Sequence, residues 1–288
     1  MAFFEIKNVR IAGLAAGVPK NVESTISTND KYDAASFIET TGVIEKRYSQ
    51  DFTTSDYCEA AAKQLIEDLK WDKQDIDAIV FVTQTADYIL PATSCVLHGK
   101  MGLKKDCFTL DISLGCSGWV YGLNTLMCLM QGGAIKKALL MAGDARGQVV
   151  PKLPPDQLFG HAGTVTALEY GDFDDVYRFD MGSDGTGYDA IIKPYGGTRN
   201  QMTKDTFGIF EDEEGKPTSN FASKMKGMDV FAFGITTAPK SVKKLAKYYE
   251  FDYLDYDYFV FHQANMKMNK TIEKKLKLDT SKVPYCMP

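Results

Sequence analysis

The segment from Phe108 to Leu123, FTLDISLGCSGWVYGL, constrains the fold and the chemistry of this chain more than any other. Apolar residues alternate with Thr109 and Asp111 at its start, which predicts a short strand. A glycine turn follows, and from Ser117 onward the apolar residues recur at helical spacing. The sequence therefore predicts that Cys116 lies where a strand passes into a helix.

A cysteine in this position has a specific chemical environment. The first backbone N–H groups of a helix have no partner within the helix, and the helix dipole is positive at this end. Both effects favour the thiolate of Cys116, and the same N–H groups can hold the oxyanion that forms when a thioester is attacked. A buried core cysteine is the alternative. Because Gly115 and Gly118 flank the thiol within a strand-to-helix turn, we interpret Cys116 as a nucleophile.

Length and composition exclude several classes of protein. With 288 residues the chain can form one large domain or two smaller ones, and 44% hydrophobic with 25% charged residues is typical of a globular protein. No apolar stretch is long enough to span a membrane, and the first residues do not resemble a secretion signal. A net charge of −5 argues against a general nucleic-acid binder. We therefore expect a cytoplasmic protein that binds neither membrane nor nucleic acid.

The cysteines and histidines predict neither disulfides nor a metal site. The six cysteines form no CxxC pair and have no regular spacing, so we expect reduced thiols that lie mostly in the core. The three histidines are too far apart in the sequence for a metal-binding motif. These residues are Cys58, Cys95, Cys107, Cys116, Cys128 and Cys286, and His98, His161 and His262.

Apolar runs alternate with amphipathic segments along the chain, which predicts an α/β fold. Strands are expected at 9–15, 78–82, 108–112, 138–142, 164–168 and 258–261. Five helices are expected. The first is capped by Thr54 or Ser55, the second runs from after Pro91 to about Met101, and the third begins at Ser117. The last two cover 236–249 and 266–278.

His262 occupies a position similar to that of Cys116, at the end of a predicted strand and just before a predicted helix. Two such segments can bring a thiol and an imidazole to a shared pocket, which makes His262 the best candidate for a partner of Cys116. As a neutral imidazole it can donate a hydrogen bond to a thioester enolate. A structural, hydrogen-bonded histidine is the alternative.

Four segments, in order and at matching spacing, resemble those of the β-ketoacyl-acyl-carrier-protein synthase III family. They are the Gly-Cys-Ser-Gly segment within 111–123, Thr41-Gly42-Val43 through Arg47, Leu158-Phe159-Gly160 through Thr166, and Phe261-His262-Gln263-Ala264-Asn265. The resemblance covers nearly the whole chain. It implies a thiolase-like αβαβα layered fold of two related halves, usually in a homodimer. On this basis we expect halves at 1–171, with the nucleophile, and 172–288, with the histidine.

The resemblance also implies the reaction. Cys116 would take an acyl group from acyl-CoA, and malonyl-acyl-carrier-protein would lose CO₂ and attack the acyl-enzyme to give 3-oxoacyl-acyl-carrier-protein. His262 would stabilise the enolate. Acyl-CoA would be a substrate, acyl carrier protein a partner, and no metal or redox cofactor would be required. The expected role is in the biosynthesis of fatty acids or related acyl chains.

Further site residues follow from the resemblance alone. Phe37 matches the aromatic residue that stacks on the CoA adenine, Arg47 lies where basic residues approach the CoA phosphates, and Asn265 lines the pantetheine channel. Ile89 and Leu90 match the segment that crosses a dimer interface to shape the partner's acyl pocket. Without the resemblance, we would interpret Phe37 as a core residue and Arg47 as a solvated charge.

The chain departs from the family pattern in two places. His161 stands where the family usually has aspartate. We expect this difference to affect the geometry of the glycine loop, or its charge below neutral pH, more than the chemistry. The family's third catalytic residue, an asparagine in a Gly-Asn-Thr/Ser segment, lies beyond the last residue, and Asn265 cannot replace it. We therefore expect a second half without its final strands, and losing that donor would cost on the order of 10²–10³ in rate. A truncated chain that is impaired or non-catalytic is the alternative to an active enzyme. A second alternative is a related enzyme that condenses two acyl chains or that transfers an acyl group to a small molecule.

Overall fold

The computed structural model describes residues 2–24, 34–146, 158–212, 215 and 217–287. By packing, these residues form two compact units. The first contains residues 2–24, 45–146 and 159–181, and the second contains 34–44, 158, 182–212, 215 and 217–287. The halves 1–171 and 172–288 remain a prediction, because compactness does not report whether two halves resemble each other.

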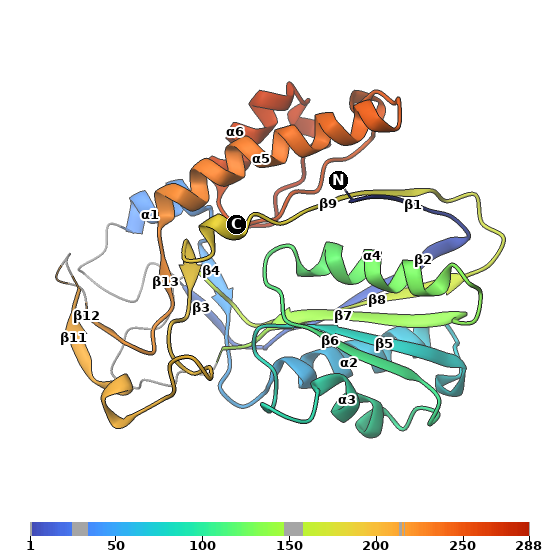
Figure 1. The fold of residues 1–288 in the computed structure, drawn as a ribbon, viewed down its shortest axis with the longest axis horizontal. Helices are drawn as coiled ribbons and strands as arrows, with labels where there is room; N and C mark the ends of the chain where they lie inside the picture. Colours follow the sequence, from blue (N-terminus) through green and yellow to red (C-terminus); the bar gives the residue numbers. More distant parts are fainter. Residues whose placement is uncertain (1, 25–33, 147–157, 213–214, 216, 288) are drawn as a thin grey trace. The chain divides into compact units, whose positions relative to one another are not determined.

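A five-stranded mixed sheet forms the centre of the first unit (Figure 1). In spatial order its strands are β2 (Val9–Gly17), β8 (Ala162–Tyr170), β7 (Lys137–Asp144), β5 (Ile76–Val82) and β6 (Phe108–Ile112). β5 is parallel to both β6 and β7, whereas β8 is antiparallel to β7 and β2. The carboxyl ends of β5, β6 and β7 therefore meet at one edge of the sheet, where α/β folds commonly place their sites.

Helices cover both faces of this sheet (Figure 1). α2 (Thr54–Asp68) and α3 (Thr93–Met101) lie on one face, and α4 (Gly118–Met130) lies on the other. Because side chains alternate along a strand, Ile79 and Phe81 of β5 pack with α2 and α3, while Val80 and Val82 pack with α4. All of β5 except Asp77 is buried, which confirms the predicted strand with cover on both faces.

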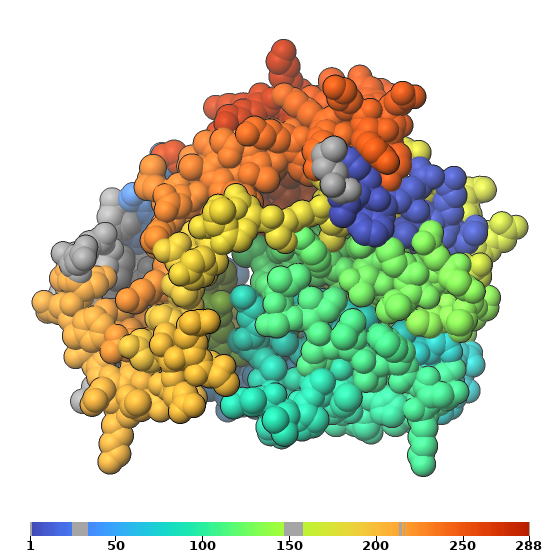
Figure 2. Space-filling view, in the orientation of Figure 1, coloured from blue at the N-terminus to red at the C-terminus, as the bar shows by residue number. Residues whose placement is uncertain are grey.

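A two-stranded ribbon lies over α4 on the side away from the sheet. β1 (Ala2–Ile6) pairs antiparallel with β9 (Tyr177–Met181), and Ile6 and Phe179 join the apolar core that includes Leu126 of α4. Figure 2 shows the blue residues of this N-terminal strand against the green segment that includes α4. Neither strand was predicted from the sequence. The unit also contains the hairpin of β3 (Val22–Ser24) and β4 (Glu45–Arg47), and a 3₁₀ turn at Lys73–Asp75.

The second unit is mainly helical. α5 (Gly227–Tyr248) and α6 (Met266–Leu276) lie side by side, and α1 (Ala34–Thr41) packs against α6 (Figure 1). Two short antiparallel ribbons complete it, β10 (Ile191–Ile192) with β13 (Lys224–Met225) and β11 (Ile209–Glu211) with β12 (Pro217–Ser219). Its 3₁₀ turns are Gly185–Gly187, Lys204–Phe207, Tyr253–Asp255 and Thr280–Lys282.

Three predictions about local structure were wrong. The strand expected at 258–261 has no regular structure, because an apolar run becomes a strand only when another strand pairs with it, and within the described residues these four join no sheet. α5 begins at Gly227 and not at 236, since its first turns pack against α6 through Gly234 and Met268. α2 has Thr53 as its N-cap rather than Thr54 or Ser55, and the Thr53 N–H is bound by Asp56 at 3.0 Å.

Within the described segments, no helix combines the length and the apolar character that crossing a bilayer requires. The same segments bring together no group of three or more histidine, cysteine or acidic side chains able to hold a metal ion.

Candidate active site

Cys116 lies in the connection between β6, which ends at Ile112, and α4, which begins at Gly118. This confirms the predicted strand-to-helix position. Two backbone hydrogen bonds close the turn, from Leu114 N to Ile112 O at 3.1 Å and from Gly118 N to Gly115 O at 2.7 Å. Because β6 is parallel to β5, the connection lies at the carboxyl edge of the sheet.

The expected electrostatic state of this thiol was wrong in its net direction. Burial of the Cys116 thiol raises its pKa above the ordinary value of 9.0, although the residue as a whole is exposed. A hydrogen bond from its own backbone N–H and the nearby Arg146 guanidinium lower the pKa, while the Asp144 carboxylate raises it further. The effect expected from the helix N-terminus is therefore outweighed by loss of water around the sulfur.

The first turns of α4 approach the sheet more closely than any side chain would allow. A Cβ placed on Gly118 would lie 2.5 Å from Cγ1 of Val82, and one placed on Gly122 would lie 2.6 Å from Cδ1 of Leu140. The glycines therefore set how close the start of α4, and with it Cys116, lies to β5 and β7.

We expect Gly118→Ala to displace the start of α4, to lower the free energy of unfolding by about 1–3 kcal/mol, and to change the rate at which iodoacetamide alkylates Cys116. Urea unfolding and alkylation kinetics measure the two effects. Gly132→Ala is the matched control, since a Cβ there meets nothing within 4 Å. Equal effects of the two substitutions on stability and alkylation would contradict this account of α4.

His262 precedes α6 in the second unit, and its segment is held by three amides. Asn265 caps α6, its Oδ1 accepting from Met268 N at 3.0 Å. The buried Asn269 donates through Nδ2 to the carbonyl oxygen of His262 at 3.1 Å. Gln263 donates to the carbonyl oxygen of Phe261 at 2.9 Å. Burial lowers the pKa of His262 below 6.5, which keeps its imidazole neutral at pH 7.

The other expected site residues are distributed over both units. Phe37 is half-buried in α1, and Arg47 ends β4, where its exposed guanidinium donates to Pro19 O at 3.0 Å. Ile89 and Leu90 are 94% and 79% exposed. Cys116, Arg47, Ile89 and Leu90 thus belong to the first unit, and Phe37, His262 and Asn265 to the second. That the thiol and the imidazole share a pocket remains a prediction.

His161 is a buried residue that packs into the first unit. Its ring lies 4.5 Å from the ring of Tyr48, its Nε2 lies 3.0 Å from Arg146 O, and its backbone N–H donates to Arg47 O at 2.8 Å. Burial lowers the pKa of this histidine, so that it stays neutral at pH 7. These contacts give the residue a structural role in its loop at that pH.

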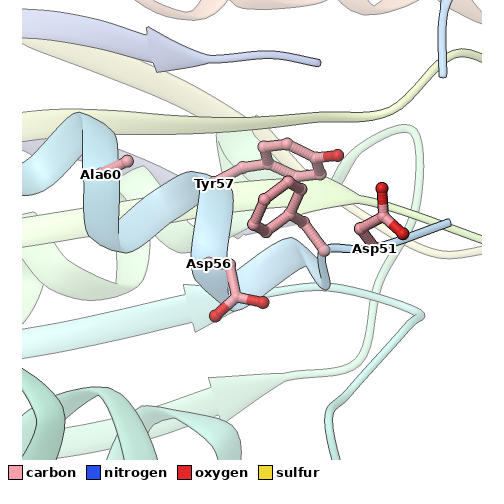
Figure 3. A pocket seen from close by; sticks show the side chains of 5 residues that line it. Asp51, Asp56, Tyr57 and Ala60 are labelled. Atoms are coloured by element: carbon pink, nitrogen blue, oxygen red, sulfur yellow. The ribbon is translucent and has the colours of Figure 1, made fainter. Parts of the chain in front are cut away.

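A hollow of about 440 Å³ at the start of α2 contains none of the expected site residues. Figure 3 shows Asp51, Asp56 and Tyr57 around it, and the ring of Tyr57 meets that of Phe52 edge to face at 6.0 Å. Asp56 is paired with Lys100 at 2.8 Å. Because neither Cys116 nor His262 lines the hollow, we do not assign the chemistry to it.

Asp144, which ends β7 at the same sheet edge as Cys116, was not among the site residues predicted from the sequence. The available signal was a carboxylate two residues after the apolar run 138–142. Asn269 was missed as well, because a polar residue on a helix is usually exposed.

Comparison with known proteins adds to this geometry. The sequence profile of the family described as 3-oxoacyl-[acyl-carrier-protein (ACP)] synthase III matches residues 110–185, which include Cys116. The chain is 32% identical to a Campylobacter jejuni protein named as a 3-oxoacyl-[acyl-carrier-protein] synthase 3, over 96% of this chain and 80% of that one. It is 30% identical to a Fusobacterium nucleatum β-ketoacyl-[acyl-carrier-protein] synthase III, over 96% of this chain and 83% of the relative.

The fold is similar as well. The crystal structure of a 3-oxoacyl-(acyl-carrier protein) synthase from Burkholderia xenovorans superposes with a TM-score of 0.87 and 34% identity, covering 99% of this chain and 82% of the other. This likeness confirms the thiolase-like α/β fold expected from the sequence. With such similarity along nearly its whole length, the chain belongs to the 3-oxoacyl-[acyl-carrier-protein] synthase III family.

Proposed function

We propose that this chain is an acyltransferase that condenses an acyl group from acyl-CoA with malonyl-acyl-carrier-protein. The products are 3-oxoacyl-acyl-carrier-protein, CoA and CO₂, as in the synthesis of fatty acids or related acyl chains. The observation that carries the proposal is Cys116 in the strand-to-helix turn, within the segment that matches the family profile.

In the first half-reaction the Cys116 sulfur attacks the carbonyl carbon of the acyl-CoA thioester. The carbonyl becomes a tetrahedral oxyanion, which the backbone N–H of Cys116 at the start of α4 is suited to bind. The carbon–sulfur bond to CoA then breaks, CoA leaves as its thiolate, and the acyl group remains on the cysteine. Because burial raises the pKa of Cys116, the proton on this sulfur must be removed before or during the attack.

In the second half-reaction the malonyl thioester loses CO₂, and the electron pair of the broken carbon–carbon bond forms an enolate. A neutral imidazole at His262 is suited to donate a hydrogen bond to the enolate oxygen, and the lowered pKa of this histidine supports that role. The enolate carbon attacks the acyl carbonyl, the bond to the Cys116 sulfur breaks, and the thiolate is regenerated.

Three residues are proposed to bind the CoA or pantetheine chain. Phe37 supplies an aromatic face for adenine, and the exposed Arg47 supplies a charge for the phosphates. Asn265 already uses its Oδ1 to cap α6, so its NH₂ group is the part proposed to contact pantetheine. The reaction uses acyl-CoA as a substrate, and the proposal requires no cofactor.

We further propose a homodimer in which Ile89 and Leu90 pair with a second copy. The strong exposure of these two adjacent apolar side chains supports it. The cytoplasmic location expected from the sequence is part of the same proposal. The alternative of an impaired or non-catalytic subunit draws no support from the comparisons, since the relatives described above are named as synthases.

Intact-mass measurement after brief exposure to acyl-CoAs of different length tests the first half-reaction. We expect a gain of one acyl group, and its loss on addition of malonyl-acyl-carrier-protein, with a 3-oxoacyl product on the carrier. A folded protein that gains no mass from any acyl-CoA would contradict the proposal. A product formed from two acyl-CoAs, or an acylated small molecule, would favour the alternatives left open by the sequence.

A further inference from the structure

A polar cluster of Thr54, Thr83, Thr85 and Asp144, here called the Asp144 cluster, lies at the carboxyl edge of the sheet. Thr83 directly follows β5, Asp144 ends the parallel strand β7, and Thr54 begins α2. Thr54 and Thr83 are buried. The cluster therefore lies at the same edge as the connection that carries Cys116.

Asp144 holds the loop after β5 through a single carboxylate oxygen. Its Oδ1 accepts from the backbone N–H of Gln84 at 2.8 Å, and from the hydroxyls of Thr83 and Thr85 at 3.0 Å each. The Thr85 hydroxyl also lies 2.7 Å from that of Thr54. Hydrogen bonds to a carboxylate are roughly twice as strong as neutral ones. Three of them on one oxygen fix residues 83–85 to the end of β7.

The loop held in this way touches the residues just before Cys116. A Cβ placed on Gly115 would lie 2.7 Å from Oε1 of Gln84, so the Gln84 amide packs directly on this glycine. Thr83 N donates to Ile112 O at 3.2 Å, which ties the same loop to the end of β6. A continuous series of contacts therefore joins Asp144, through residues 83–85, to the turn that carries Cys116.

We propose that Asp144 is a positioning residue for Cys116, because it holds loop 83–85 against Gly115 and so fixes the turn that carries the thiol. This inference rests on the proposed function only where it takes Cys116 to be the nucleophile. The carboxylate also acts through its charge, since it opposes formation of the Cys116 thiolate. The same group therefore improves the geometry of the nucleophile and reduces its ionisation.

Two substitutions at this position separate geometry from charge. Asp144→Asn keeps an oxygen that can accept the three hydrogen bonds but removes the charge. At pH 7 we expect iodoacetamide to alkylate its Cys116 roughly two- to fivefold faster, since the gain in thiolate exceeds the loss in nucleophilicity. Acylation by acyl-CoA should persist. Asp144→Ala removes both effects, so alkylation should again be faster while acylation becomes at least about tenfold slower, because transfer from a bound thioester requires an aligned thiol, whereas iodoacetamide approaches the sulfur from solvent.

Asp174→Asn is the matched control, because it removes the same charge from an exposed position of the same unit and should change neither rate. Gln84→Ala, also at an exposed position, keeps the carboxylate and removes the contact with Gly115. It should slow acylation and leave the pH profile of alkylation unchanged. If circular dichroism shows that Asp144→Ala does not fold, Gln84→Ala still tests the geometric effect and Asp144→Asn still tests the effect of charge.

An unchanged alkylation profile in Asp144→Asn together with full acylation rates in Gln84→Ala and Asp144→Ala would overturn the inference. Failure of the proposed function looks different. In that case the unaltered protein accepts no acyl group from any acyl-CoA, while the alkylation rates of the two Asp144 variants still report whether the Asp144 carboxylate acts on the thiol.

Discussion

Replacing Cys116 with alanine should abolish acyl transfer from acyl-CoA, with a loss in rate of at least about 10⁴. The sulfur is the atom that forms the covalent intermediate, and the strand-to-helix turn contains no second thiol. The intact mass of the variant should therefore remain unchanged after exposure to an acyl-CoA that adds one acyl group to the unaltered protein.

Two other exposed cysteines provide the matched controls. Cys95 and Cys286 are also accessible, so each can acquire acyl groups by simple thiol exchange with a thioester. Cys95→Ala and Cys286→Ala should keep the rate of single acylation unchanged. Retention of the mass gain in Cys116→Ala, with its loss in either control, would assign the nucleophile to another residue.

The pH dependence of acylation gives a second measurement on the same residue. Because burial raises the pKa of Cys116, the thiolate is a minor form at neutral pH and grows as the pH rises. The rate should thus increase by up to about tenfold per pH unit until the pH reaches the thiol pKa. A rate that is flat between pH 6 and pH 9 would mean that the thiol is already ionised, or that another group removes its proton.

The parts of this fold that depend on neighbouring residues could be predicted from the sequence. The position of Cys116 between β6 and α4 follows from an alternating run, a glycine turn and a helical pattern, all within sixteen consecutive residues. β5 and β7 were predicted for the same reason, because a short apolar run between polar segments is itself a strand signal.

The features that were predicted wrongly, or not predicted at all, depend on more than their own stretch of sequence. The stretch 258–261 has the composition of a strand, but whether it becomes one depends on a pairing partner that its own residues do not specify. The pKa of Cys116 rises because burial removes water from the sulfur, which a local helix argument does not include. The Asp144 cluster brings together α2, the end of β5 and the end of β7, so no single segment could indicate it.

Replacing His262 with alanine should separate the two half-reactions. Acylation of Cys116 requires only the thiol and the oxyanion-binding N–H groups, so the mass gain from acyl-CoA should be retained. Decarboxylation needs a donor to the enolate oxygen, and losing that hydrogen bond should slow condensation by about 10²–10³. The measurements are the acyl-enzyme mass and the release of ¹⁴CO₂ from labelled malonyl-acyl-carrier-protein. His98→Ala, which changes a histidine bound to Lys104 O in the first unit, is the control.

The pH profile of condensation distinguishes the proposed role from a structural one. Burial lowers the pKa of His262 below 6.5, so its neutral form persists at pH 7 and gives way to the buried cation only as the pH falls through that lowered value. Condensation by pre-acylated enzyme should therefore decline on the acid side, and His262→Ala should remove this decline together with most of the activity. If the residue were only structural, the variant would lose acylation and condensation to the same extent and would keep the acid decline, because its remaining chemistry would still depend on the same ionisations.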